Sequence, residues 1–325
     1  SLDITYYDGA NNQTSSRPVQ GTGAAPATLS ISDGPTYNYG TVANGSSNDK
    51  SFTLTNSGGV PAISISGAGL SAPFTFKGGT FPGTGGTCSA TLSASGTCTI
   101  VVNYSPTTIA THNATMSVSY NDGVTGQSTT RAVQGTAVAP ANISVSDGPT
   151  YNFGSVANGS SNDKTFTLTN SGTFGASSMT GNGLSAPYSF KGGSYPGSGG
   201  TCSTTLASGA TCTIVVNFSP ASTATHNGTV NIDYNNGAVA VNATRAVTGT
   251  SAPPAALAIS DGPTFDFGTR ATGSTADKTF TVQNTGGTPA TSVAGTGLTS
   301  PITFKGGSYP GTGGTCTATI AASAT

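Results

Sequence analysis

A unit of 114 residues repeats along this chain, and this repeat limits the possible folds more than any other feature of the sequence. The segment "SDGPTYNYGTVANGSSNDKSFTLTNSG" (residues 32–58) returns as "SDGPTYNFGSVANGSSNDKTFTLTNSG" (residues 146–172) with 24 of 27 positions identical. A more divergent copy begins at Ser260, at the same spacing. A solenoid unit is much shorter, whereas a domain that buries its own core has about this length. The sequence therefore predicts a tandem array of domains.

The boundaries between repeats are predicted at three similar segments, "GTGAAPA", "GTAVAPA" and "GTSAPPA". Each contains a proline after small residues, where neither a helix nor a strand continues easily. The first residues, "YYDGANNQTSSRPVQGT", align with "YNDGVTGQSTTRAVQGT" near the end of the first complete repeat. We therefore expect the C-terminal strands of a preceding repeat, two complete repeats, and a repeat truncated before its last strands. These parts are residues 1–25, 26–139, 140–253 and 254–325.

Three full periods would be 342 residues, so the chain is 17 residues short of three repeats, and the missing piece corresponds to "CTIVVNYSPTTIATHNA" in the first repeat. Two interpretations fit this feature. Either the chain is a window of a longer array, or the N-terminal strands of one molecule complete the last repeat of the next. We favour the window, because a core strand would still be missing after such an exchange.

The composition excludes several classes of function. Charged residues make up 6% of the chain, the formal net charge is −1, and none of the eleven acids is Glu. Nucleic-acid binding needs clustered Lys and Arg, and the ten basic residues are thinly spread, so we expect no nucleic-acid partner. No apolar run reaches the length of a membrane helix, which is about eighteen residues or more, so we expect no membrane contact within this segment.

Apolar residues alternate with Ser, Thr and Asn in short segments separated by turn residues. Examples are Phe52 and Leu54, followed by Ile100, Val102 and Tyr104. This period of two is typical of antiparallel strands with one buried face and one wet face. Seven or eight such strands in each 114-residue repeat predict an all-β fold of tandem immunoglobulin-like sandwiches. The chain has no Trp, so the Trp of antibody-type domains is missing.

Three segments together carry a family resemblance. The order "YNFGSVANGSSNDKTFTLTNSG", "LASGATCTIVVNFSP" and "RAVTGT" resembles the choice-of-anchor D repeats of bacterial surface proteins, which are relatives of the ASH (ASPM, SPD-2, Hydin) domains. The resemblance extends over every repeat. It implies an Ig-like fold in a secreted or surface-displayed bacterial array, and it implies no enzymatic activity.

Two pairs of cysteines are candidates for disulfides. Cys88 and Cys98 flank "SATLSASGT", which we expect to form two short strands around a turn, and Cys202 and Cys212 flank the matching segment. Paired positions across a hairpin come within bridging distance, and such a bridge would add on the order of 3 kcal/mol. Buried free thiols are the alternative, but the oxidising surroundings of a secreted chain favour the bridges. Cys316 would remain unpaired in this segment.

The sequence offers little for metal or catalytic chemistry. The histidines are His112 and His226, so each complete repeat has one His and two Cys without the spacing of a zinc site. No acid lies beside either His to orient it, and we expect no catalytic residue, metal or cofactor. Asp33 and Asp122 could hold calcium, but Asp-Gly and Asn-Asp-Gly segments are first of all turn signals.

One lysine of each repeat, Lys50, Lys164 or Lys278, has the inward parity of a core strand. Two readings explain this parity. The lysine could form an internal isopeptide bond with an Asn, for which an acid such as Asp33 would relay protons. Alternatively, its stem lies over the core while its amine stays in water, and we favour this reading.

The strict register of the repeats favours a structural function. We expect a non-enzymatic array that forms an extracellular or cell-surface stalk, fibre or filament and associates along or between fibres. The alternative is an adhesin whose loops bind a glycan or a protein. Divergence between copies is concentrated in "SGGVPAISISGAG" against "SGTFGASSMTGNG" and in "VTGQST" against "AVAVNA", which keeps this alternative open.

Overall fold

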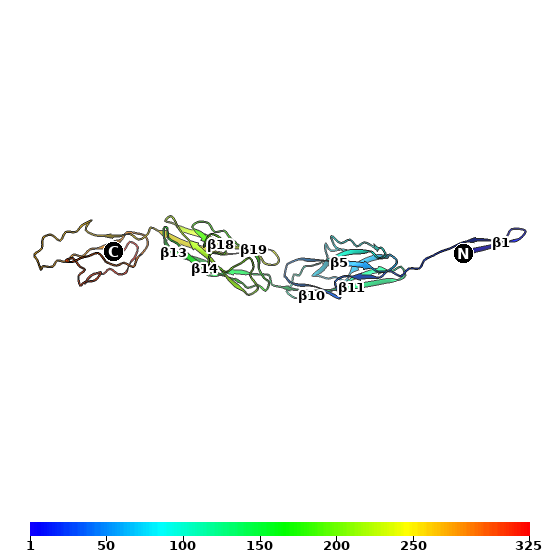
Figure 1. Cartoon of the computed structure of the whole chain (residues 1–325). Helices are drawn as coiled ribbons and strands as arrows, with labels where there is room; N and C mark the ends of the chain where they lie inside the picture. Colours follow the sequence, from blue (N-terminus) through cyan, green and yellow to red (C-terminus); the bar gives the residue numbers. More distant parts are fainter. The chain divides into compact units, whose positions relative to one another are not determined.

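The structure is a computed structural model that describes residues 1–325, and its helices and strands are all β-strands, with no α-helix among them (Figure 1). The prediction of an all-β fold is therefore confirmed. None of its segments is a helix with the length and apolar character that a membrane span requires. The chain divides into two compact units, Ser1–Ala139 and Pro140–Thr325.

The first complete repeat is a sandwich of two sheets. One sheet has the strand order β3-β5-β9-β7, and the other has the order β4-β11-β10-β6-β8. All neighbouring strands are antiparallel except β4 and β11, which run parallel. The strands are β3 (Leu29–Ile31), β4 (Thr36–Ala43), β5 (Asn48–Asn56), β6 (Ala62–Ala68), β7 (Phe74–Phe76), β8 (Thr91–Leu92), β9 (Thr97–Tyr104), β10 (Thr111–Asn121) and β11 (Gly126–Val138).

The second complete repeat has the same two sheets, in the orders β12-β14-β17-β16 and β13-β19-β18-β15. It has eight strands, and the first repeat has one more because the two-residue β8 pairs with β6. The strands are β12 (Ile143–Val145), β13 (Thr150–Ala157), β14 (Asn162–Asn170), β15 (Ser177–Asn182), β16 (Tyr188–Phe190), β17 (Thr211–Phe218), β18 (Thr225–Asn235) and β19 (Ala240–Ala252).

The alternating residues form the core of each sandwich. Phe52, Leu54 and Ile100 are fully buried in the first repeat. Their neighbours on β5 are exposed or half-buried, as expected for a sheet with one wet face, whereas Val101 beside Ile100 on β9 is buried. Close packing also sets the place of Gly135, since a Cβ there would lie 2.4 Å from the ring of Tyr104. The aromatic ring therefore packs directly against the backbone of β11.

A buried asparagine closes each sandwich at the end of a core strand. Asn56 has 0% exposure, and its Oδ1 accepts hydrogen bonds from the backbone N–H groups of Thr28 and Gly58. Its Nδ2 donates to the carbonyl oxygens of Val60, Leu92 and Ser93. One amide thus ties three separate segments together. Asn170 and Asn284 make the equivalent bonds in the other two repeats.

Residues 1–25 contain a single hairpin of β1 (Leu2–Tyr7) and β2 (Asn12–Arg17). The carboxylate of Asp8 accepts hydrogen bonds from the N–H groups of Ala10 and Asn11 and so fixes the turn. Asp122 makes the same turn between β10 and β11, and Asn236 makes it between β18 and β19. The hairpin thus has the local structure of the last strands of a complete repeat.

Residues 254–325 contain short strands only. The strands are β20 (Leu257–Ile259), β21 (Val282–Asn284), β22 (Ala290–Thr291) and β23 (Thr319–Ile320). Phe280 is 39% exposed, whereas its counterparts Phe52 and Phe166 have 0% exposure. In the first repeat the buried core that contains Phe52 also includes Met116, Val118 and Val133 of the later strands β10 and β11.

Candidate functional site

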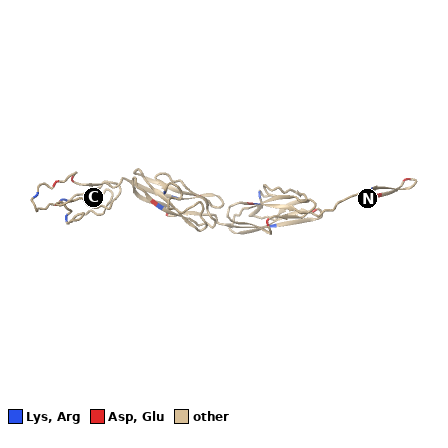
Figure 2. Ribbon diagram, viewed as in Figure 1, with Lys and Arg blue, Asp and Glu red and all other residues tan.

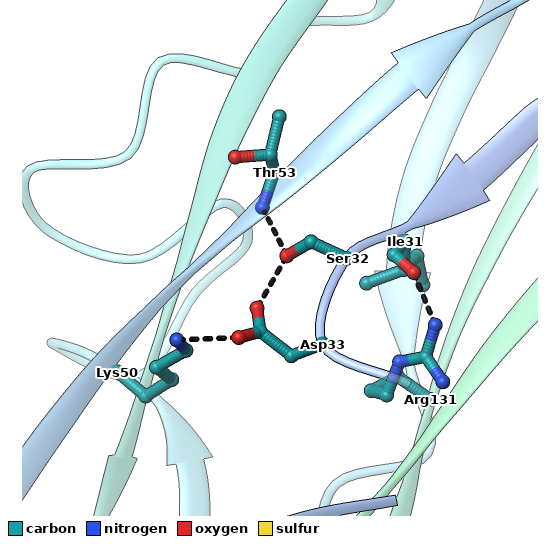
Figure 3. Close-up of polar contacts among 6 residues, drawn as sticks. All are labelled: Ile31, Ser32, Asp33, Lys50, Thr53 and Arg131. Atoms are coloured by element: carbon teal, nitrogen blue, oxygen red, sulfur yellow. Dashed lines mark hydrogen bonds and ion pairs between the residues drawn. The ribbon is translucent and has the colours of Figure 1, made fainter. Parts of the chain in front are cut away.

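The most regular polar feature of the chain is a cluster of Ser32, Asp33 and Lys50, which we call the lysine cluster (Figure 3). Asp33 follows β3 in the left-handed backbone region, with φ of 70°, which Asp tolerates better than most residues. Lys50 Nζ lies 2.8 Å from Asp33 Oδ1 and 4.7 Å from the ring centre of Tyr37. The serine hydroxyl accepts a hydrogen bond from the N–H group of Thr53 on β5.

A guanidinium completes this arrangement. Arg131 on β11 donates a hydrogen bond to the carbonyl oxygen of Ile31, at the end of β3 (Figure 3). The loop after β3 is therefore held by β5 of one sheet and by β11 of the other. These contacts hold the turn in place.

The lysine cluster recurs in each repeat. Lys164 Nζ lies 2.9 Å from Asp147 and 4.6 Å from the ring centre of Tyr151. Lys278 Nζ lies 2.6 Å from Asp261 and 4.6 Å from the ring centre of Phe265. Recurrence at the same position in three repeats is what a structural role requires.

Ion pairing and hydrogen bonding lower the pKa values of these carboxyl groups. The hydrogen bond from Lys50, followed by the one from Ser32, holds the pKa of Asp33 below its ordinary value. For Asp147 the hydrogen bond from Ser146 contributes most, followed by that from Lys164. The six lysines of the chain all form ion pairs with aspartates, and charges are sparse along the whole chain (Figure 2).

The structure brings Lys50 together with the acid that the sequence suggested as a proton relay. The Lys50 side chain is 25% exposed and its amine is ion-paired with Asp33, which fits a lysine stem that lies over the core. The same geometry holds at Lys164 and Lys278. An isopeptide bond at these positions stays the untested alternative to this reading, and an intact mass lower by one ammonia for each bond would reveal it.

Both expected disulfides are present. Cys88–Cys98 and Cys202–Cys212 have Cα–Cα distances of 4.8 Å and 4.9 Å, and Cys316 is a free thiol. The local structure differs from the expected hairpin, because Cys98 lies on β9 but Cys88 lies in a loop. The short strand between them, β8, pairs with β6 of the other sheet. The N–H group of Cys88 instead donates to the carbonyl oxygen of Thr99, which holds the loop beside β9.

The remaining candidates serve local structure. His112 lies at the start of β10, and its Nδ1 lies 2.9 Å from Tyr104 Oη. His226 contacts the hydroxyl of Ser251. No three His, Cys, Asp or Glu side chains lie close enough together to hold a metal ion. The carboxylate of Asp122 is occupied by the N–H groups of its own turn.

Two surface hollows overlap in part with the segments that diverge between the repeats. The hollow in the second repeat has a volume of about 540 Å³, and that in the first repeat has about 310 Å³. The hollow in the second repeat is lined by Ser178, Asp233, Tyr234, Asn235, Ala240, Val241 and Asn242. The other hollow is lined by Ala24, Pro26, Val60, Pro61, Ile63, Asp122, Gly123 and Val124.

Comparison with family models gives two matches, at residues 27–136 and 142–249, to the HYDIN/CFA65/VesB-like, Ig-like domain. The matches cover more than half of the chain. The chain belongs to this family. The resemblance to ASH-like repeats is thereby confirmed, and so is the prediction of tandem Ig-like sandwiches. A comparison with curated proteins finds no match.

Several solved structures are similar to this HYDIN/CFA65/VesB-like chain. The ASH/PapD-like domain 7 of human CEP192 is 17% identical, with 38% of this chain and 95% of that one covered and a TM-score of 0.28. The VesB protease of Vibrio cholerae is also 17% identical, with 34% and 32% covered and a TM-score of 0.28. Titin domains I67–I69 are 11% identical, with 76% and 83% covered and a TM-score of 0.35.

Proposed function

We propose that this chain is a structural repeat array, without enzymatic activity, that forms part of an extracellular or cell-surface stalk, fibre or filament. The observation that carries the proposal is the repetition of one sandwich with one set of fastening contacts. The lysine cluster, the disulfide and the buried asparagine occur at the same positions in both complete repeats. A scaffold needs such uniformity, whereas a catalytic site needs a single copy.

The disulfides and the ion pairs of the lysine cluster support this role. Disulfides persist in oxidising surroundings, which favours a location outside the cytoplasm. Self-contained sandwiches with separate cores can be added in series without changing one another. Such an array associates with further copies of itself along or between fibres.

The location can be tested with antibodies raised against the 325-residue chain. Cells of the source organism are labelled before and after permeabilisation. A surface array is labelled on intact cells, and protease treatment of the intact cells removes the label. Labelling that requires permeabilisation would contradict the proposal.

The mechanical role can be tested by single-molecule stretching of the same chain. One unfolded repeat of 114 residues has a contour length of roughly 390 Å, since each residue adds about 3.4 Å, and the unfolding step equals this length minus that of the folded sandwich. An intact disulfide hides a ten-residue loop, so the step is shorter by roughly 35 Å without reductant. Two equal steps that lengthen with reductant are expected. A gradual extension without steps would contradict a mechanical role of the sandwiches.

Adhesion is the second candidate function, because more than half of the residues that line each hollow differ from their equivalents in the other repeat. Binding residues are free to diverge where the scaffold is not. A glycan or a protein would be the ligand of such a surface.

A further inference from the structure

The second repeat carries a polar patch that the first repeat lacks. Three strands, β19, β18 and β15, lie side by side in one sheet. On β18 the side chains of Val230, Ile232 and Tyr234 are buried, so Asn231 and Asp233 point outward between them. The pairing register places Asn242 beside Asp233, and it places Asn182 beside Asn231. We call these four outward residues the amide patch.

The side chains of the amide patch are joined by hydrogen bonds. Asn242 Nδ2 donates to Asn231 Oδ1 at 3.0 Å, and Asn231 Nδ2 donates to Asn182 Oδ1 at 2.6 Å and to Asp233 Oδ1 at 2.9 Å. Asn182 Nδ2 donates to the other carboxylate oxygen of Asp233. The bonds fix all four side chains in one orientation, which reduces the entropy lost when a ligand is bound.

The network leaves hydrogen-bonding capacity on the outside. Asn182 and Asn242 are exposed, whereas Asn231 and Asp233 are half-buried between them. The Asn242 carbonyl oxygen has no partner in the network, and the outer Nδ2 groups each keep one free hydrogen. The patch therefore presents both donors and acceptors to solvent.

The patch continues into the hollow of about 540 Å³, whose lining includes Asp233 and Asn242. The wall of this hollow begins at a bulge in β15, where the pairing with β18 shifts between Ser177 and Thr180. Ser178 in the bulge has a φ of 53° and also lines the hollow. The rigid amides thus form one side of a concave surface.

The first repeat has the same backbone without the amides. The equivalent positions, 114 residues earlier, are Ala68, Ser117, Ser119 and Ser128. Their strands pair in the same register, and the same bulge is present at Ser64. The fold therefore does not require Asn or Asp here, and the four changes need another explanation.

The chemistry of the patch indicates the class of ligand. Apolar side chains of β18 are turned into the core, so the patch has no anchor for the apolar centre of a protein interface. The guanidinium of Arg245 on β19 is occupied by the carbonyl oxygens of Val145 and Pro149, and the carboxylate of Asp233 repels anions. Sugar hydroxyls are neutral and both donate and accept, which matches amides and a single carboxylate.

We propose that the amide patch and its hollow bind an uncharged, hydroxyl-rich oligosaccharide on the second repeat. This inference rests on adhesion as the second candidate function, and it is independent of the structural role. A chain that binds no glycan can still be a stalk, and the stalk tests above do not depend on this site.

The test is binding of the full chain to an immobilised panel of neutral oligosaccharides (cello-, manno-, malto- and galacto-oligomers) and acidic ones (oligogalacturonates). The variant is Asn231→Ser, Asn242→Ser and Asp233→Ser together, which installs the residues of the first repeat and should preserve the fold. The immobilised neutral oligosaccharides should retain the unaltered chain. The affinity of the variant for them should be at least about tenfold lower, since several hydrogen bonds are lost.

The matched control alters the first repeat at the equivalent positions, with Ser117→Ala, Ser119→Ala and Ser128→Ala together. It should bind as the unaltered chain does. The proposal would be overturned if the unaltered chain bound no neutral oligosaccharide or bound acidic ones only. Equal binding by the unaltered chain and the second-repeat variant would also overturn it.

Discussion

At the scale of single residues, the buried asparagine contributes to the fold in a way that no apolar residue could. Asn170 has 0% exposure and satisfies two N–H groups and three carbonyl oxygens. Replacing Asn170 with Ala would remove the acceptor of the Asn142 and Gly172 N–H groups and one donor to three carbonyl oxygens, at a cost of about 3 kcal/mol. Backbone amides of β14 and β17 should therefore exchange hydrogen faster in the variant than in the unaltered chain.

The control for this prediction is Asn217→Ala on the same sheet. Asn217 donates one hydrogen bond, to the exposed carboxylate of Asp163, and water can replace it. A change of less than about 1 kcal/mol is expected. Equal effects of the two substitutions would show that the buried network is not what stabilises the repeat.

The ion pairs of the lysine cluster predict a dependence of stability on pH. The pKa values of Asp33 and Asp147 in the folded chain lie below the ordinary value of 3.8, so the charged carboxylates favour the folded state. This contribution is complete above about pH 5 and is lost as the pH falls through 3.8 toward the lower folded values. Each pair is partly exposed, so the loss is at most about 1 kcal/mol per pair.

The measurement is the urea midpoint at neutral and acidic pH for the unaltered chain and for Asp33→Asn with Asp147→Asn. Asn tolerates the left-handed backbone of these positions, with φ of 70° and 61°, so the exchange removes the charge alone. The double variant should lose less stability on acidification. An identical acid response in both chains would exclude these pairs as its source.

Residues with a regular period were predictable, and residues with a special environment were not. Alternation was sufficient to place Phe52 and Leu54 in the core. The burial of Asn56 was missed, because an Asn before Ser-Gly reads as a turn and its partners Leu92 and Ser93 are distant in sequence. The signal was available, since "TN" or "QN" followed by Ser-Gly or Thr-Gly ends this strand in all three repeats. The amide patch was missed because its residues come from three strands whose register only the structure gives.

At the scale of elements, the disulfide fastens a loop to the central strand β17. The sequence predicted the pairing but not the local structure, since β8 of the first repeat joins the opposite sheet. Replacing Cys202 and Cys212 with Ser together should lower the stability of the second repeat by about 2–3 kcal/mol, because a short loop is released in the unfolded state. Thermal unfolding with and without reductant measures this loss.

The same pairing predicts the reactivity of the thiols. In the absence of reductant, an alkylating reagent should label Cys316 and leave the four paired cysteines unlabelled. After unfolding in the presence of reductant, the reagent should label the other four cysteines as well. Labelling of Cys88 or Cys202 in the untreated native chain would contradict the bridges.

At the scale of the whole molecule, the chain is a series of domains with separate hydrophobic cores. The core of the first repeat contains Phe52, Leu54 and Ile100, and the core of the second contains Phe166, Leu168 and Ile214, with no residue in common. The repeat length in the sequence was sufficient to predict this organisation. Because the two copies repeat the same buried positions, each copy forms a core of its own.

Separate cores predict separate unfolding. Phe166→Ala removes a fully buried ring and should destabilise the second repeat by about 3–5 kcal/mol. Hydrogen exchange should then accelerate in β14 and β17, while β5 and β9 of the first repeat keep the protection that they have in the unaltered chain. Phe52→Ala is the matched variant and should give the reverse pattern. Loss of protection in both repeats from either substitution would show that they fold as one cooperative unit, and a stalk built from independent domains would then be excluded.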